Sequence, residues 1–88
     1  MSARVTRDEI HSKLTSVFRS IFDDDSIVLT ATTSADDIEE WDSLNQIKII
    51  LACEQVFNVK LNSRKVNTLA NVGQMEDYLD GVLNAAAE

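Results

Sequence analysis

The sequence predicts a single all-α domain over residues 1–88. Three segments carry apolar residues at helical spacing, and no two segments show strand patterns that could pair. Glycine occurs twice and proline not at all, which argues against a turn-rich β-sandwich or barrel. A chain of this size buries one small core, so no second domain is expected.

The first helix is expected from Thr6 to about Phe22. Thr6 and Glu9 match a capping box, in which the threonine hydroxyl accepts from a free backbone N–H and the glutamate reaches back. One apolar face follows, made of Ile10, Leu14, Val17, Phe18 and Ile21. The only histidine, His11, falls on the opposite side, where an imidazole is expected to be merely solvated.

A polar connection over residues 23–42 separates the first and second helices. It carries eight acids and no base, in a chain whose net charge is −7. We interpret it as a solvated loop held open by charge repulsion, a role compatible with electrostatic docking of basic partners. Ile27, Val28 and Leu29 are expected to pin it to the core. A calcium loop of the EF-hand type is excluded, because Val28 stands where that loop needs glycine.

The second helix is expected from Ser43 to about Phe57, and it shows two apolar stripes. The stripe that suits a core face comprises Ile49, Ile50, Cys53, Val56 and Phe57. The other stripe comprises Leu44, Ile47 and Leu51. A surface helix needs only one apolar stripe, so the second stripe predicts an exposed apolar patch beside the helix start. Cys53 is interpreted as a buried structural thiol.

A further helix is expected from about Val72 to Ala86, with Asn71 as its N-cap and Gln74 three residues on. Its inner face comprises Val72, Met75, Leu79, Val82 and Leu83, with Tyr78 beside them. Between this helix and the second one, a short helical turn is expected over residues 64–67.

Composition and motifs exclude several classes of function. One cysteine and one histidine cannot build a Cys/His zinc site or a disulfide, so no metal ligands are expected. The negative net charge disfavours nucleic-acid binding. The longest aliphatic run is too short to span a membrane and no secretory signal is visible, so we expect a soluble, cytoplasmic protein.

No catalytic arrangement emerges from the sequence. There is no G-x-S-x-G motif and no second histidine, which opposes an esterase-like enzyme. The adjacent acids Glu39 and Glu40 lie in a polar loop, where a shared carboxylate site is not expected. We therefore expect a protein without an active site of its own.

The element that carries chemistry is the tripeptide Asp42-Ser43-Leu44 at the start of the second helix. Asp42 can cap free backbone N–H groups, and its charge suits the positive end of the helix dipole. A phosphate ester on the Ser43 hydroxyl would be favoured at the same place. Taken alone, the tripeptide is best interpreted as a helix cap.

The residues around the tripeptide change this interpretation. Trp41-Asp42-Ser43-Leu44, the apolar residues that follow through Phe57, and the segment from Asn71 to Leu79 resemble the acyl carrier protein family. Members of this family are phosphopantetheine-binding four-helix domains. The resemblance extends over residues 10–83 and implies a four-helix bundle with a long first loop and a short third helix, in agreement with the periodicity.

This resemblance implies that Ser43 is the attachment site of 4'-phosphopantetheine, which a phosphopantetheinyl transferase takes from coenzyme A. The terminal thiol then carries an acyl group as a thioester, so Ser43 is a tether and not a catalytic nucleophile. Asp42 is expected to assist recognition by the transferase. A monomer is expected, with acyl-loading and acyl-processing enzymes as its further partners. The patch on which they are expected to dock comprises Leu44, Ile47, Lys48 and Leu51.

Departures from fatty-acid carriers favour a specialised pathway over primary fatty-acid synthesis. Trp41 precedes Asp42 where many fatty-acid carriers have a Gly-x pair, and Lys48 and Gln55 stand where acids are common. The W-D-S-L motif is more typical of discrete carriers in polyketide-like, peptide-like or surface-polymer biosynthesis. The alternative is a small acidic helical adaptor, in which the apolar stripe binds a partner helix and Ser43 is only a cap.

Overall fold

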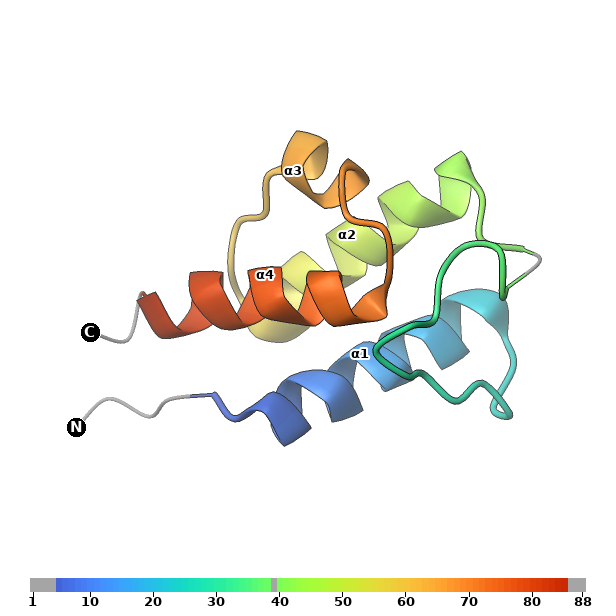
Figure 1. Cartoon of the computed structure of the whole chain (residues 1–88), viewed down its shortest axis with the longest axis horizontal. Coiled ribbons are helices and arrows are strands. Elements are labelled where there is room, and N and C mark those ends of the chain that lie inside the picture. The colour runs from blue at the N-terminus through green and yellow to red at the C-terminus, as the bar shows by residue number, and fades with distance from the viewer. Residues whose placement is uncertain (1–4, 39, 86–88) are drawn as a thin grey trace.

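The computed structural model describes residues 5–38 and 40–85 (Figure 1). Helix α1 spans Arg7–Phe22, α2 spans Ser43–Phe57, α3 spans Ser63–Asn67 and α4 spans Val72–Ala85. The described residues contain no strand, so the all-α prediction is confirmed, together with the short turn before the last helix. The predicted last residue of that helix, Ala86, lies outside the described residues.

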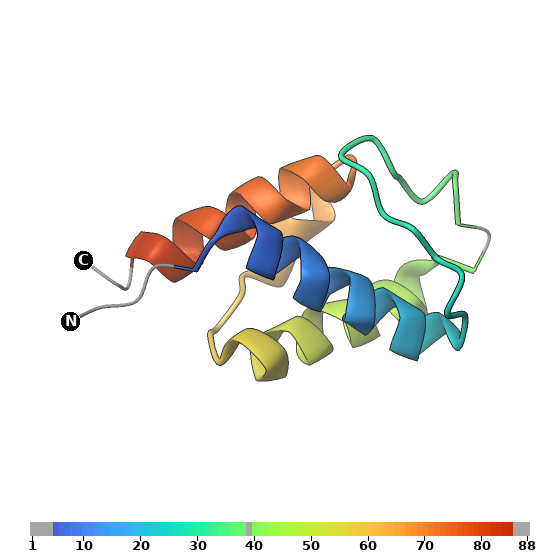
Figure 2. The same ribbon diagram turned by 90° about the horizontal axis from the view of Figure 1, so that it is seen from below.

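Three long helices surround the core, and α1 packs against both α2 and α4. The short α3 contacts α2 and joins it to α4. The connection between α1 and α2 runs over one end of the bundle, as both ribbon views show (Figures 1 and 2). At the other end, the start of α1 lies beside the end of α4.

Two hydrogen bonds hold that second end together. The backbone N–H of Val5 donates to Oδ1 of Asn84 over 2.9 Å, and Nδ2 of Asn84 donates to the carbonyl oxygen of Val5 over 3.2 Å. Asn84 is buried, so its side-chain atoms in these two hydrogen bonds are shielded from solvent. They fasten the residue before α1 to the last turns of α4.

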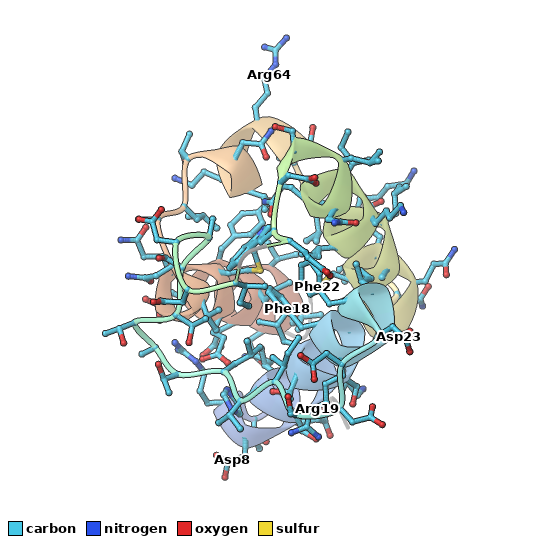
Figure 3. All side chains as sticks on the ribbon, turned by 90° about the vertical axis from the view of Figure 1, so that its right-hand side faces the viewer. Asp8, Phe18, Arg19, Phe22, Asp23 and Arg64 are labelled. Atoms are coloured by element: carbon cyan, nitrogen blue, oxygen red, sulfur yellow. The ribbon has the colours of Figure 1, made fainter. Side chains whose placement is uncertain are left out.

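Apolar side chains from all four helices and one from the connection between α1 and α2 form the core. It comprises Ile10, Leu14, Val17, Phe18, Phe22, Leu29, Ile49, Ile50, Cys53, Phe57, Val66, Val72, Met75, Leu79 and Leu83. Figure 3 shows Phe18 and Phe22 between the helices and Arg64 projecting outward from α3. The two phenylalanine rings are tilted against each other with centroids 5.8 Å apart.

The predicted caps begin the three long helices. The Thr6 hydroxyl accepts from the backbone N–H of Glu9 over 3.2 Å. The side chains of Asp42 and Asn71 accept from the N–H groups three residues on, each over 2.9 Å. The reciprocal half of the predicted capping box is not formed, because the Glu9 carboxylate lies 4.0 Å from the ammonium of Lys13 instead.

Two residues predicted to face the core do not. Val28 is 72% exposed, whereas Leu29 is buried and Ile27 is half-buried. Successive residues of an extended segment point in opposite directions, so only alternate side chains of this segment reach the core. Val56 is exposed as well, because it stands at the edge of its stripe and borders a shallow groove between α1 and α2.

The long connection is docked onto the start of α4 and is more than a solvated loop. The N–H of Val72 donates to the carbonyl of Thr33 over 2.8 Å, and the N–H of Gly73 donates to the carbonyl of Ala31 over 2.9 Å. The first N–H groups of a helix have no partner within the helix, so the connection supplies the missing acceptors. These two hydrogen bonds fasten residues 31–33 of the connection to α4, while the described carboxylates of the connection are exposed.

His11 is paired, which corrects the expectation that it is merely solvated. Its Nδ1 lies 2.6 Å from Oε2 of Glu76, a buried residue of α4. The guanidinium of Arg7 lies 2.6 Å from the carboxylate of Asp77 and 3.7 Å from that of Glu76. The hydrogen bond with Asp77 is the main cause that raises the pKa of Arg7. These pairs join α1 to α4 along one edge.

Candidate functional site

Ser43 is the first residue of α2, at the point where the long connection meets the helix, and its side chain is exposed. The preceding residue, Asp42, caps the helix through a carboxylate oxygen that accepts from the N–H of Asn45. The amide of Asn45 in turn donates to the carbonyl of Glu40 over 2.7 Å. The backbone on both sides of Ser43 is therefore fixed by hydrogen bonds.

Trp41 anchors this junction to the core. Its indole ring meets Phe18 edge to face, with centroids 4.9 Å apart and the planes at 88°. Its Nε1–H donates to Oε1 of Gln46 over 2.6 Å. In the sequence, Trp41 served as part of the W-D-S-L motif and as a departure from fatty-acid carriers, and this positioning role was missed. A lone tryptophan directly before a helix cap was the signal that could have indicated it.

The N-terminus of α2 suits a phosphate ester on Ser43. The first turn of α2 contains no acidic residue, and the carboxylate of Asp42 is occupied as the cap. The free N–H groups and the dipole of a helix N-terminus favour an anion there. The exposed hydroxyl of Ser43 is therefore a suitable position for a phosphate-linked group.

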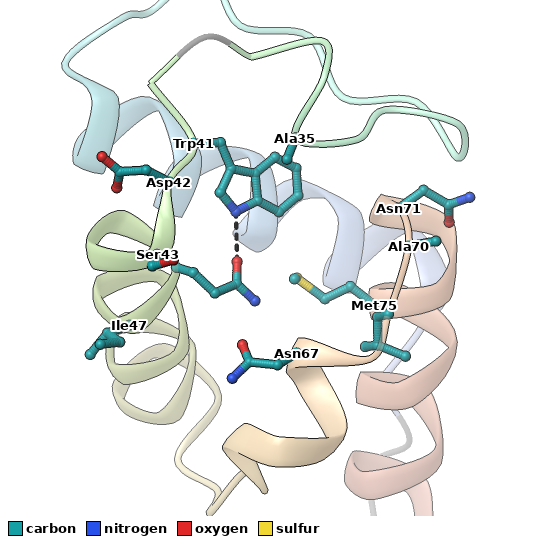
Figure 4. A pocket seen from close by; sticks show the side chains of 11 residues that line it. Ala35, Trp41, Asp42, Ser43, Ile47, Asn67, Ala70, Asn71 and Met75 are labelled. Atoms are coloured by element: carbon teal, nitrogen blue, oxygen red, sulfur yellow. Dashed lines mark hydrogen bonds between the residues drawn. The ribbon is translucent and has the colours of Figure 1, made fainter.

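Ser43 opens onto a groove of about 510 Å³ between the starts of α2 and α4 (Figure 4). Its polar lining includes Gln46 and Asn67, and Figure 4 shows the amide of Asn67 directed from α3 toward α2. Ile47 and Met75 supply apolar surface. The volume falls within the range of about 300–1,000 Å³ that is common for ligand pockets.

The predicted exposed apolar patch on α2 is present. Its three aliphatic residues are between 55% and 63% exposed, and they are Leu44, Ile47 and Leu51. Lys48 is exposed beside them. Ile47 belongs both to this patch and to the groove, so the patch begins directly beside Ser43.

The other reactive groups lie away from the groove. Cys53 is 2% exposed, and burial raises the pKa of its thiol to about 12. His11 is engaged by Glu76 on the α1–α4 edge. Within residues 5–38 and 40–85, no group of three or more His, Cys, Asp or Glu side chains is arranged to hold a metal ion. The expectation that Glu39 and Glu40 form no shared carboxylate site is not tested, because Glu39 lies outside the described residues.

No helix in the described part of the chain combines the length and the apolar character that crossing a membrane requires.

Comparisons with known proteins agree with this geometry. The family model described as phosphopantetheine attachment site matches residues 12–79. The solution NMR structure of holo acyl carrier protein from Geobacter metallireducens is 42% identical to this chain, covers 88% of each chain and superposes with a TM-score of 0.80. The search of curated proteins returned no match. The matched region includes α2 and the groove beside its first residue.

Proposed function

The chain belongs to the acyl carrier protein family, and from this premise we propose that Ser43 is the residue that bears its phosphopantetheine. As a member of this family, the protein carries acyl groups on covalently attached phosphopantetheine and is not an enzyme. The observation that carries the assignment is the position of Ser43: an exposed hydroxyl, first in a long helix, that opens onto a groove.

Other serines suit the role less well. The Ser34 hydroxyl accepts from the N–H of Asp36 within a turn of the connection. Ser63 begins α3, which has only five residues, so its dipole is short. Ser43 combines exposure with the N-terminus of a helix of 15 residues.

The bound group supplies a flexible arm whose terminal thiol holds an acyl group as a thioester. The protein's own residues form the attachment point of this arm and hold it in position. Ser43 provides the oxygen for the phosphodiester, and Asp42 fixes the start of α2 so that this oxygen stays exposed. The side chain of Trp41 ties the same segment to Phe18 in the core. The attachment point is thus held rigidly, while the arm gives reach and a high local concentration of cargo.

We further propose that phosphopantetheinyl transferase and the acyl-loading and acyl-processing enzymes contact the patch of Leu44, Ile47 and Leu51. Apolar contacts supply most of the affinity at such a surface, while a bordering charge sets selectivity and the association rate. Lys48 is that bordering charge, and it favours partners of a specialised pathway over those of primary fatty-acid synthesis. One copy contains Ser43, the groove and the patch, so the proposed working form is a monomer. We propose that this monomer works in the cytoplasm.

Intact mass spectrometry tests the assignment. The purified protein is incubated with coenzyme A, magnesium and a broad-specificity phosphopantetheinyl transferase, in parallel with Ser43→Ala and the matched control Ser63→Ala. The wild type and Ser63→Ala are expected to gain the mass of one phosphopantetheine, and Ser43→Ala none, with unchanged circular dichroism. Uptake by a folded Ser43→Ala protein would contradict the site. No uptake by any of the three would favour the helical adaptor.

A further inference from the structure

Positive charge gathers on α2 and α3 in a chain whose net charge is −7. Between residues 43 and 75 the sequence contains a single acid, Glu54, and its carboxylate is occupied, because it accepts from the backbone N–H of Leu61 over 2.9 Å. The basic residues of the same stretch are Lys48, Lys60, Arg64 and Lys65. These two helices therefore present positive charge on a molecule that is otherwise strongly negative.

The cations of this stretch are available to a partner. All of them are exposed, and Figure 3 shows Arg64 projecting outward from α3. The ion pairs formed within residues 5–38 and 40–85 involve Arg7, His11 and Lys13 of α1, and none of the cations of α2 and α3. Their charge is not neutralised by the described part of the chain, so an approaching protein meets it directly.

These cations border the exposed apolar patch of α2 on opposite sides. Lys48 follows Leu44 by about one helical turn and lies at the edge of the patch that is away from Ile47. On the other edge, Ile47 lines the same groove as Asn67, the last residue of α3. The patch therefore lies between Lys48 and α3, which carries two further cations.

The start of α3 is held in place by hydrogen bonds. The backbone N–H of Asn62 donates to the Tyr78 hydroxyl over 3.0 Å, which fastens this point to α4. Oδ1 of Asn62 accepts from the backbone N–H groups of Arg64 and Lys65 over 3.0 and 3.3 Å. The two cations of α3 thus stand on a fixed backbone, and binding a partner does not have to order it.

The surroundings favour a protein partner over a membrane or a nucleic acid. An extended layer of phosphates would also face the acidic remainder of the molecule and be repelled by it. A compact partner meets only the local surface. An apolar centre with a charged rim is the usual anatomy of a protein interface, whereas a row of phosphates offers nothing apolar to the centre.

We propose that α2 and α3 together form one docking surface with an apolar centre and a cationic rim of Lys48, Arg64 and Lys65, and that its partner is an enzyme with an acidic rim around an apolar centre. The inference rests on the docking role proposed for the patch and deepens it by naming the chemistry of the partner. The apolar centre supplies affinity, and the rim selects acidic partners and speeds their association.

Two amphipathic helical peptides test the charge of the partner. Both have the same leucine face, which is flanked by glutamates in one peptide and by lysines in the other. Each is added to the isotope-labelled chain at physiological ionic strength, and backbone amide shifts in NMR spectra report the site and the dissociation constant. The glutamate peptide is expected to bind at α2 and α3 about 3- to 10-fold more tightly than the lysine peptide. The net charge of −7 alone would give the reverse order.

Charge reversal identifies the residues of the rim. Arg64→Glu and Lys48→Glu should each weaken the binding of the glutamate peptide by about 3-fold or more and strengthen that of the lysine peptide. The matched control is Lys60→Glu, which makes the same change beyond the end of α2 and outside the rim, and it should change the affinity by less than about 2-fold, because charges more than about 8 Å apart are largely screened. Circular dichroism verifies that each variant is folded.

Several outcomes would overturn the proposal. Equal or tighter binding of the lysine peptide at α2 and α3, no shifts there with either peptide, or equal effects of Arg64→Glu and Lys60→Glu would each do so. Vesicles containing phosphatidylserine are tested in parallel, and shifts of α2 and α3 caused by the vesicles and not by the glutamate peptide would make this face a lipid-binding surface.

Intact mass after treatment with the transferase separates this proposal from the function of Ser43. If Ser43 is loaded but the glutamate peptide does not bind, the partner chemistry is wrong and the carrier function stands. If Ser43 is not loaded but the peptide binds, the attachment site is wrong and the docking surface stands.

Discussion

The backbone N–H of Gly73 donates to the carbonyl oxygen of Ala31 over 2.9 Å, and a Cβ placed on Gly73 would lie 2.7 Å from that same oxygen. Carbon and oxygen atoms that are not bonded do not approach so closely, and this oxygen belongs to backbone that cannot swing away. The connection between α1 and α2 therefore approaches α4 at a point where only glycine leaves room.

Replacing Gly73 by alanine is expected to destabilise the protein by about 1–3 kcal/mol, because the connection must move off the start of α4. The matched control is Gly81→Ala, since nothing lies within 4 Å of a Cβ at Gly81. That change should stabilise α4 by up to about 1 kcal/mol through helix propensity. Urea unfolding of both variants measures the two effects, and effects of the same sign would contradict the close contact.

The pair of His11 and Glu76 predicts a cost for removing the imidazole. His11→Ala leaves a buried carboxylate without its 2.6 Å partner, so a loss of roughly 1–3 kcal/mol in the free energy of unfolding is expected. Ser12→Ala is the matched control on the exposed side of the same helix, and it should change stability by less than about 0.5 kcal/mol. If the two substitutions change the free energy of unfolding equally in chemical denaturation, the pair of His11 and Glu76 does not contribute to stability.

Burial of Cys53 predicts slow labelling and a dispensable side chain. Cys53→Ala should lower the free energy of unfolding by roughly 1 kcal/mol or somewhat more through lost packing, with loading of phosphopantetheine intact. A thiol reagent should label the native apo protein far more slowly than the urea-unfolded protein, because the thiol is 2% exposed. Labelling of the native protein at the rate of the unfolded one would contradict burial.

The raised pKa of Cys53 also predicts a pH dependence. An ordinary thiol has a value of 9.0, and burial raises the pKa of this one to about 12 in the folded state. Between these values the unfolded chain has released the proton and the folded chain has kept it. Stability should therefore fall as pH rises above 9, by up to about 1.4 kcal/mol per pH unit from this group. The free energy of unfolding of Cys53→Ala should fall less steeply over the same pH range, as measured by a series of denaturant unfolding experiments.

The exposed patch on α2 predicts how partners respond to substitution. Ile47→Ala should weaken the binding of every partner by about 1 kcal/mol or more, because apolar anchors supply most of the docking energy. Lys48→Glu should instead weaken the cognate enzyme and improve use by a fatty-acid synthase enzyme. The control is Lys60→Glu, which makes the same charge change beyond the end of α2. If Lys48→Glu leaves the ratio between the activity of the cognate enzyme and that of the fatty-acid synthase enzyme unchanged, the support for a specialised pathway is lost.

Local signals predicted most of the helical framework. The caps at Thr6, Asp42 and Asn71 depend on residues within one turn, so their positions could be predicted from the sequence and agree with the structure. The exposed stripe of α2 was equally predictable, because it follows from helix geometry alone. The choice of Ser43 as the attachment site came from the family resemblance and not from helix geometry, and it stays a prediction.

The features that were missed depend on residues far apart in the chain. His11 and Glu76 are 65 positions apart, and no periodicity links them. Val56 was assigned to the core because its stripe is apolar, but its exposure depends on how α1 crosses α2. The packing of Trp41 on Phe18 likewise joins two separate segments. Tertiary contacts of this kind are not encoded in any local pattern.

The hydrogen bonds between Val5 and Asn84 have a practical consequence for protein engineering with this domain. They hold the residue before α1 beside the last turns of α4 at one end of the bundle, and α2 begins near the opposite end (Figure 1). Domains with adjacent ends accept insertion and circular permutation well. The carrier can therefore be inserted into a host loop, or immobilised on a bead through that end, while the start of α2, where we propose the attachment site, stays open to solution.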